Sequence, residues 1–159
     1  MVRLLADMGN DDITQHSRLR TPLTAQVVKT AGELPTCLAT CVTQEGRLAP
    51  YRDLGVQILP LPQGADGHVD LAALVTLLGK MGVDSVLAEG GAQLHWGLVQ
   101  AGLVNRVQAY LAPKLLGGQG AKSPVGGQGF PHPDQALSLS SPTLTRLGED
   151  ILLESEVTG

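Results

Sequence analysis

Apolar positions in the first part of the chain fall into short runs separated by turn residues. The runs 36–43 (TCLATCVT) and 56–61 (VQILPL) are rich in β-branched and aliphatic residues, which is typical of buried strands. Residues 44–54 between them suit a short helix that Pro50 would interrupt. Residues 2–6 predict one further strand. Strands that alternate with helices in this way predict parallel pairing.

The middle of the chain continues the same alternation. Asp70 is expected to cap a helix in which Leu71, Leu74, Leu77 and Leu78 recur at helical spacing. Residues 84–88 (DSVLA) predict a third short strand, and residues 92–100 predict the helix that follows it. Residues 106–112 (RVQAYLA) predict another strand.

The last part of the chain has a different pattern. Residues 116–133 form a long loop rich in glycine and proline, and loops of this length are usually functional or mobile. Residues 144–147 and 151–157 predict two strands joined by a hairpin turn. We therefore expect an α/β fold, with a mostly parallel central sheet, helices on both faces and a C-terminal antiparallel hairpin.

Composition narrows the function classes. A formal net charge of -4 and 3% aromatic residues argue against nucleic-acid binding, although they leave room for a small phosphorylated ligand. No apolar run approaches the roughly 20 residues needed to cross a bilayer, and no leader peptide is evident, so we expect a cytoplasmic protein. Cys37 and Cys41, about 13 Å apart on a strand, predict two free thiols. No zinc-ligand quartet exists, so no metal is expected.

The run 87–94 (LAEGGAQL) is the strongest candidate for chemistry. It predicts a buried strand that ends at the carboxylate of Glu89, followed by two glycines and the start of a helix. Ligands of open α/β sheets bind beyond the carboxyl ends of strands, and a helix N-terminus attracts phosphate. The glycines would let a pyrophosphate approach the backbone. The alternative is an ordinary strand-to-helix turn, because Gly-Gly is not the G-x-G-x-x-G fingerprint.

Two basic segments are weaker candidates. Residues 17–21 (SRLRT) carry two arginines and two hydroxyls, which suits the 2′-phosphate that distinguishes NADP from NAD. The alternative is a solvated basic loop. Lys114, at a strand end before a glycine pair, suits an anionic substrate, and the alternative is an exposed loop lysine. Trp96, early in a predicted helix, is either a core residue or a wall of the cofactor site.

Several segments together resemble the reductase half of the bifunctional riboflavin biosynthesis deaminase–reductase. They occur in the family's order, and the combination of E-G-G, A-P-K-L-L-G-G and a closing G-E-D-I-L-L strand is specific. The segments are SRLRTPL (17–23), VDLAAL (69–74), SVLAEGGAQLHWGLVQAGLV (85–104), AYLAPKLLGG (109–118), AKSPVGG (121–127) and GEDILLE (148–154).

The resemblance implies a dihydrofolate-reductase-like fold and a specific reaction. NADPH would reduce 5-amino-6-(5-phosphoribosylamino)uracil to its ribitylamino product, by hydride transfer to the anomeric carbon of the ribose opened as an imine. By position, Glu89 corresponds to a substrate contact, and we expect it to be catalytic; Lys114 is the second expected substrate contact. The expected cofactor-binding residues are Ser17, Arg18, Arg20, Gly90, Gly91, Ala92, Gln93, Leu94, His95, Trp96 and Gly97.

The resemblance begins partway into the family's reductase domain. Residues 1–16 match it poorly, so we expect the later part of a reductase domain over 17–159, with the deaminase half and the first reductase strands without counterpart. The alternative is a non-catalytic nucleotide-binding or assembly module left by truncation. A sheet shortened in this way exposes an edge, which predicts a homodimer. The expected ligand partner is a phosphorylated pyrimidine.

Overall fold

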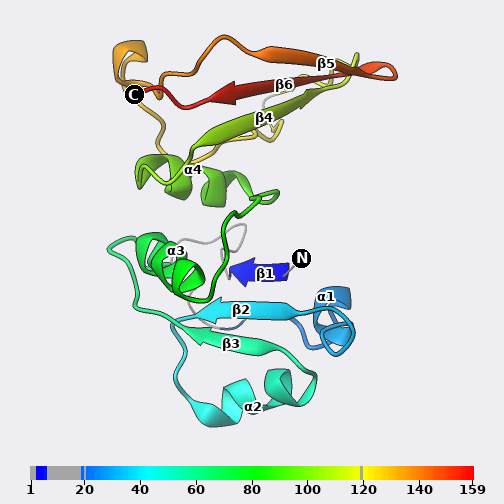
Figure 1. The fold of residues 1–159 in the computed structure, drawn as a ribbon, viewed down its shortest axis with the longest axis vertical. Coiled ribbons are helices and arrows are strands. Elements are labelled where there is room, and N and C mark those ends of the chain that lie inside the picture. Colours follow the sequence, from blue (N-terminus) through cyan, green and yellow to red (C-terminus); the bar gives the residue numbers. More distant parts are fainter. Residues whose placement is uncertain (1–2, 7–18, 20, 119) are drawn as a thin grey trace. The chain divides into compact units, whose positions relative to one another are not determined.

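The computed structural model of the chain describes residues 3–6, 19, 21–118 and 120–159. The chain divides into two compact units, Met1–Gly91 and Ala92–Gly159, each with its own three-stranded sheet (Figure 1). The boundary falls inside the run 87–94, which the sequence marks as the main candidate site.

The first unit contains the predicted parallel sheet. Its strands lie in the order β1 (Arg3–Ala6), β2 (Thr36–Thr40) and β3 (Gln57–Pro60), and both pairings are parallel. α2 (Glu45–Asp53) connects β2 to β3, as the sequence predicts. Pro50 lies inside α2 without ending it, so the expected interruption of this helix is wrong.

β2 is buried along its whole length. Leu38 is fully buried and packs in a cluster to which the short helix α1 (Gln26–Lys29) contributes Val28 and α2 contributes Leu48 and Tyr51. Successive side chains of a strand point to opposite faces, and the neighbours of Leu38 are buried as well. Both faces of this strand are therefore covered, which explains its continuous apolar sequence.

α3 (Leu71–Lys80) follows the predicted pattern closely. The Asp70 carboxylate accepts a hydrogen bond from the Ala73 amide at 2.9 Å, which satisfies one of the free N–H groups of the first turn. Its buried side chains are Leu71, Leu74 and Leu78, one helical face. Local sequence alone accounts for the start of this helix and for the face that it buries.

The hydroxyl of Tyr51 joins α2 to the segment that follows Leu19. Tyr51 is buried, and its hydroxyl donates a hydrogen bond to the Thr21 carbonyl at 2.5 Å. We expect Tyr51→Phe to lower the free energy of unfolding by about 1 kcal/mol, the usual net contribution of one such bond. Urea unfolding of the variant measures the change.

Tyr110→Phe is the matched control, because Tyr110 is the chain's other tyrosine and is 64% exposed. Removing its hydroxyl should change the free energy of unfolding by no more than about 0.5 kcal/mol. Equal effects of the two substitutions would contradict the structural role of the Tyr51 hydroxyl.

Residues 84–88 do not form the predicted strand. Val86 and Leu87 are 54% and 70% exposed, and neither sheet of the described residues includes this segment. A strand requires a hydrogen-bonded neighbour, which the apolar pattern of one segment cannot guarantee. Glu89 therefore follows an exposed irregular segment and not the end of a buried strand.

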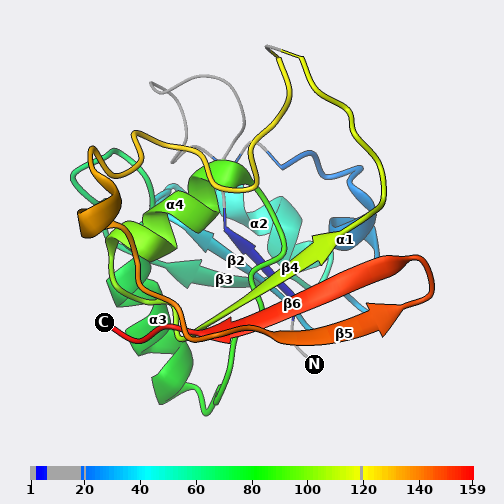
Figure 2. The ribbon, with the colours of Figure 1, turned by 90° about the horizontal axis from the view of Figure 1, so that it is seen from above.

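The second unit is an antiparallel sheet with one longer helix. α4 (Ala92–Gln100) precedes β4 (Arg106–Leu111), and a long loop with the 3-10 helix η1 (Pro133–Gln135) leads to β5 (Thr143–Leu147) and β6 (Asp150–Glu156). β6 lies between β4 and β5, antiparallel to both (Figure 2). The C-terminal hairpin and the α/β class are confirmed.

Two smaller expectations concern the thiols and the membrane. Neither Cys37 nor Cys41 forms a disulfide, as predicted, and burial raises the pKa of the Cys37 thiol. In the described part of the chain, none of the helices has the length and apolar character that a membrane span requires.

Candidate functional site

The Glu89–Gly91 turn lies at the surface. All three residues are exposed, and Gly91 has φ +77°, a backbone conformation that favours glycine. An added Cβ at Gly90 would meet no atom within 4 Å. The turn leads directly into α4. It is therefore open to a ligand, and its backbone carries no side-chain bulk at the two glycines.

A segment of the long loop after β4 contacts one side of α4, and the sequence alone does not predict this contact. We name residues 123–127 (SPVGG) the strap. The Gly126 amide donates a hydrogen bond to the Ala92 carbonyl at 2.9 Å, and Nδ1 of His95 lies 2.8 Å from the Pro124 carbonyl oxygen. Figure 2 shows the loop leaving β4, running outward and returning past α4 before it reaches η1.

Trp96 takes part in the same contact. Its ring meets that of Phe130 edge to face, with centroids 5.2 Å apart and planes at 71°, and Gly127 lies close against the indole. Of the two alternatives for Trp96, these contacts favour packing within the protein. The sequence marks this loop only through its glycine content and its AKSPVGG segment.

The other predicted site residues lie on different segments of the chain. Lys114 lies in the exposed segment 112–118, where its amide donates to the Ala112 carbonyl at 2.8 Å. Glu89 belongs to the first unit and Lys114 to the second. Gln93 is exposed, and Leu94 and Gly97 are half-buried on α4.

The predicted 2′-phosphate contacts Ser17, Arg18 and Arg20 lie outside the described residues. Leu19 is described: it is 8% exposed, has φ +53° and belongs to the core cluster of the first unit. The basic segment therefore contains one residue that is anchored in the core.

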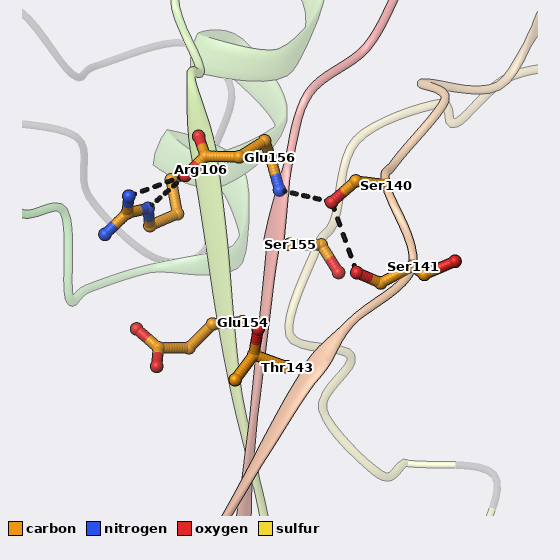
Figure 3. Close-up of a pocket in the computed structure, with 7 residues that line it drawn as sticks. All are labelled: Arg106, Ser140, Ser141, Thr143, Glu154, Ser155 and Glu156. Carbon is orange, nitrogen blue, oxygen red and sulfur yellow. Dashed lines mark hydrogen bonds and ion pairs between the residues drawn. The ribbon is translucent and has the colours of Figure 1, made fainter.

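An open cavity of about 190 Å³ lies on the C-terminal sheet (Figure 3). It is smaller than the roughly 300–1,000 Å³ of typical ligand pockets, so it does not suit a dinucleotide. Arg106 binds Glu156 there, with Nε 2.7 Å from Oε1, and this bond raises the pKa of the guanidinium. No predicted site residue lines the cavity. Its residues are Arg106, Ser140, Ser141, Thr143, Glu154, Ser155 and Glu156.

The metal-binding types of side chain do not cluster in the described part of the chain. No group of three or more His, Cys, Asp or Glu side chains gathers there in a way that could hold an ion. The candidate turn consists of the exposed carboxylate of Glu89 and two exposed glycines directly before a helix.

Comparison with known proteins identifies relatives over most of the chain. A family model described as the RibD C-terminal domain matches residues 13–153. The riboflavin biosynthesis protein RibD of Actinobacillus pleuropneumoniae is 44% identical over 87% of this chain and 36% of its own length. The 2,5-diamino-6-ribosylamino-4(3H)-pyrimidinone 5′-phosphate reductase of Methanothermobacter thermautotrophicus is 35% identical over 58% of this chain and 43% of its own length.

A solved structure supports the same relationship. RibD of Acinetobacter baumannii superposes with a TM-score of 0.68 and 30% sequence identity, over 89% of this chain and 36% of that chain. The fold expected from the resemblance is thereby confirmed. The chain spans less than half the length of these three relatives.

Proposed function

Because this chain belongs to the RibD C-terminal domain family, we propose that it is a reductase of riboflavin biosynthesis. Its reaction would be the NADPH-dependent reduction of 5-amino-6-(5-phosphoribosylamino)uracil to the ribitylamino product. The observation that carries the proposal is the family match over residues 13–153, which includes the exposed Glu89–Gly91 turn and α4.

The turn before α4 fits a dinucleotide. Its glycines leave the backbone bare, Gly91 adopts a left-handed conformation, and the first amides of a helix bind phosphate through hydrogen bonds and the helix dipole. Within the segment 90–97, the bare glycine backbone and the first amides of α4 would hold the cofactor. When bound, the reduced nicotinamide supplies the hydride, and the protein supplies position and electrostatics.

Glu89 and Lys114 would bind the substrate. An exposed carboxylate beside the cofactor turn can accept hydrogen bonds from the substrate's hydroxyl or amino groups, and a lysine ammonium can pair with its phosphate. Ser17, Arg18 and Arg20 would bind the 2′-phosphate and select NADPH over NADH. Leu19, which lies between the two arginines in sequence, is buried in the core cluster of the first unit.

The experiment that tests the proposal is a substrate-dependent oxidation of NADPH. We expect the near-ultraviolet absorbance of NADPH to fall only when the phosphoribosylaminouracil is present, and NADH to react at least about tenfold more slowly because it lacks the 2′-phosphate. The 2,5-diamino pyrimidinone phosphate named for the archaeal relative is the second substrate to test, because it distinguishes reduction before deamination from reduction after it.

The alternative is a non-catalytic module that binds nucleotide or serves in assembly. Tight NADPH binding without oxidation in the presence of either substrate would favour this module over the enzyme. Absence of all nucleotide binding would contradict the proposed function and leave only the assembly role.

We also propose that the chain is a homodimer in the cytoplasm. Among the described residues, the outer strands of the two short sheets each pair on one side only, and two cysteines without a disulfide suit a reducing compartment. Sedimentation equilibrium that shows a monomer at micromolar concentration would contradict the dimer.

A further inference from the structure

The contacts described above between α4 and the strap lie on one face of the helix. The α4 residues that meet the strap and Phe130 are Ala92, His95 and Trp96. Their spacing of three and four positions places them on the same side of a helix. Gln93, Leu94 and Gly97 fall at other positions of the same turns, away from that face.

Three contacts join this face of α4 to the strap. The Gly126 amide donates a hydrogen bond to the Ala92 carbonyl at 2.9 Å, and Nδ1 of His95 lies 2.8 Å from the Pro124 carbonyl oxygen. Gly127 approaches the Trp96 ring so closely that an added Cβ would overlap Cγ, Cδ1 and Nε1 of the indole. The Ser123 hydroxyl donates to the Val125 carbonyl at 2.7 Å, which holds the bend of the strap itself.

We infer that the start of α4 has two classes of residue. Ala92, His95 and Trp96 are positioning residues that the strap contacts, while the amides of Gln93 and Leu94, in the first turn of α4, are the part left to the dinucleotide. Gly127 is the positioning residue on the strap, because only a residue without a side chain lets the strap backbone approach the Trp96 indole this closely. This inference rests on the proposed function, and it assigns Trp96 to the strap and not to the nicotinamide or the phosphates.

The rigidity of the first turn of α4 affects how tightly that turn binds phosphate. Amides that already point at the ligand lose less freedom when it binds, so a rigid first turn raises affinity without adding a contact. The strap should therefore affect NADPH affinity much more than the rate at saturation or the KM of the pyrimidine substrate.

The test compares Gly127→Ala with Gly129→Ala. Both glycines have positive φ, +70° and +68°, so both substitutions impose the same backbone strain, but an added Cβ at Gly129 meets no atom within 4 Å. We expect Gly127→Ala to raise the Kd for NADPH about tenfold over Gly129→Ala, with kcat at saturating NADPH changed less than about twofold. Trp96, the only tryptophan, should shift its emission in Gly127→Ala alone.

Amide hydrogen exchange of residues 92–97 gives a readout that needs no cofactor. It should accelerate in Gly127→Ala and stay near the wild-type rate in Gly129→Ala. In a Trp96→Ala background the overlap is gone, so adding Gly127→Ala should produce little further acceleration. Additive effects of the two substitutions would show that Gly127 does not act through Trp96, and would overturn the inference.

The outcomes separate this inference from the proposed function. Equal NADPH affinity in the two glycine variants, in a wild-type chain that binds NADPH, overturns the strap's role and leaves the reductase standing. A wild-type chain that binds no NADPH overturns the proposed function and with it the cofactor part of this inference. Unchanged exchange of residues 92–97 in Gly127→Ala overturns the strap's hold on α4 in either case.

Discussion

Replacing Glu89 by glutamine is expected to lower kcat/KM for the pyrimidine substrate by about 10- to 100-fold, the loss of one charged hydrogen bond worth roughly 1.5–3 kcal/mol. Glu89 is exposed, and neither ion pair of the described residues involves it. The substitution should therefore leave stability within about 0.5 kcal/mol of wild type. Steady-state kinetics at saturating NADPH measures the effect.

Glu149→Gln is the matched control for this variant. Glu149 is an exposed carboxylate at the turn between β5 and β6, and no function is assigned to it. Its kcat/KM should equal that of wild type. The Kd for NADPH should be the same in both variants, because Glu89 is assigned to the substrate. A Glu89→Gln enzyme with wild-type kcat/KM would remove Glu89 from the site.

Leu38→Ala is expected to lower the free energy of unfolding of the first unit by about 2–5 kcal/mol. Leu38 is fully buried in the central strand of the parallel sheet, and it packs among side chains from α1, α2 and the start of β3. Truncation removes apolar contacts and leaves a cavity that the surrounding strands and helices fill only in part. Urea unfolding followed by far-ultraviolet circular dichroism measures the loss.

Two further variants make this prediction testable even if Leu38→Ala does not fold. Leu38→Val deletes a single methylene and should cost about 1 kcal/mol. Leu116→Ala is the control, because Leu116 is 96% exposed, and it should change stability by no more than about 0.5 kcal/mol. A similar loss for Leu38 and Leu116 would contradict the core described for the first unit.

Local signals in the sequence account for most of the elements. Asp70 and the leucines that follow it specify α3, because capping and helical spacing act within one turn of the chain. The apolar run around Leu38 also specifies its buried strand through residues that are neighbours in the sequence. α1 was not predicted, since a helix of four residues has too little periodicity to read.

Contacts between distant segments account for what the sequence did not predict. Residues 84–88 have the composition of a strand, but a strand forms only beside a second strand to which it hydrogen-bonds. Val86 and Leu87 are exposed, and neither of the two described sheets includes them. The strap depends on Gly126 meeting Ala92, which lies 34 positions earlier in the chain. The family resemblance predicts the Glu89–Gly91 turn as the cofactor site, whereas the two faces of α4 are defined by contacts that form only in the folded chain.

The pairing of β4 with β6 has a consequence for the order in which the chain can fold. β2 and β3 are joined by one short helix, so this part of the sheet can assemble as soon as it is synthesised. Arg106 and Glu156, which pair across β4 and β6, lie 50 positions apart. On a ribosome, β4 cannot form this pairing until β6 has been synthesised. The polar Arg106 and Gln108 interrupt its apolar residues, and such gatekeepers protect a waiting strand from joining a neighbouring chain.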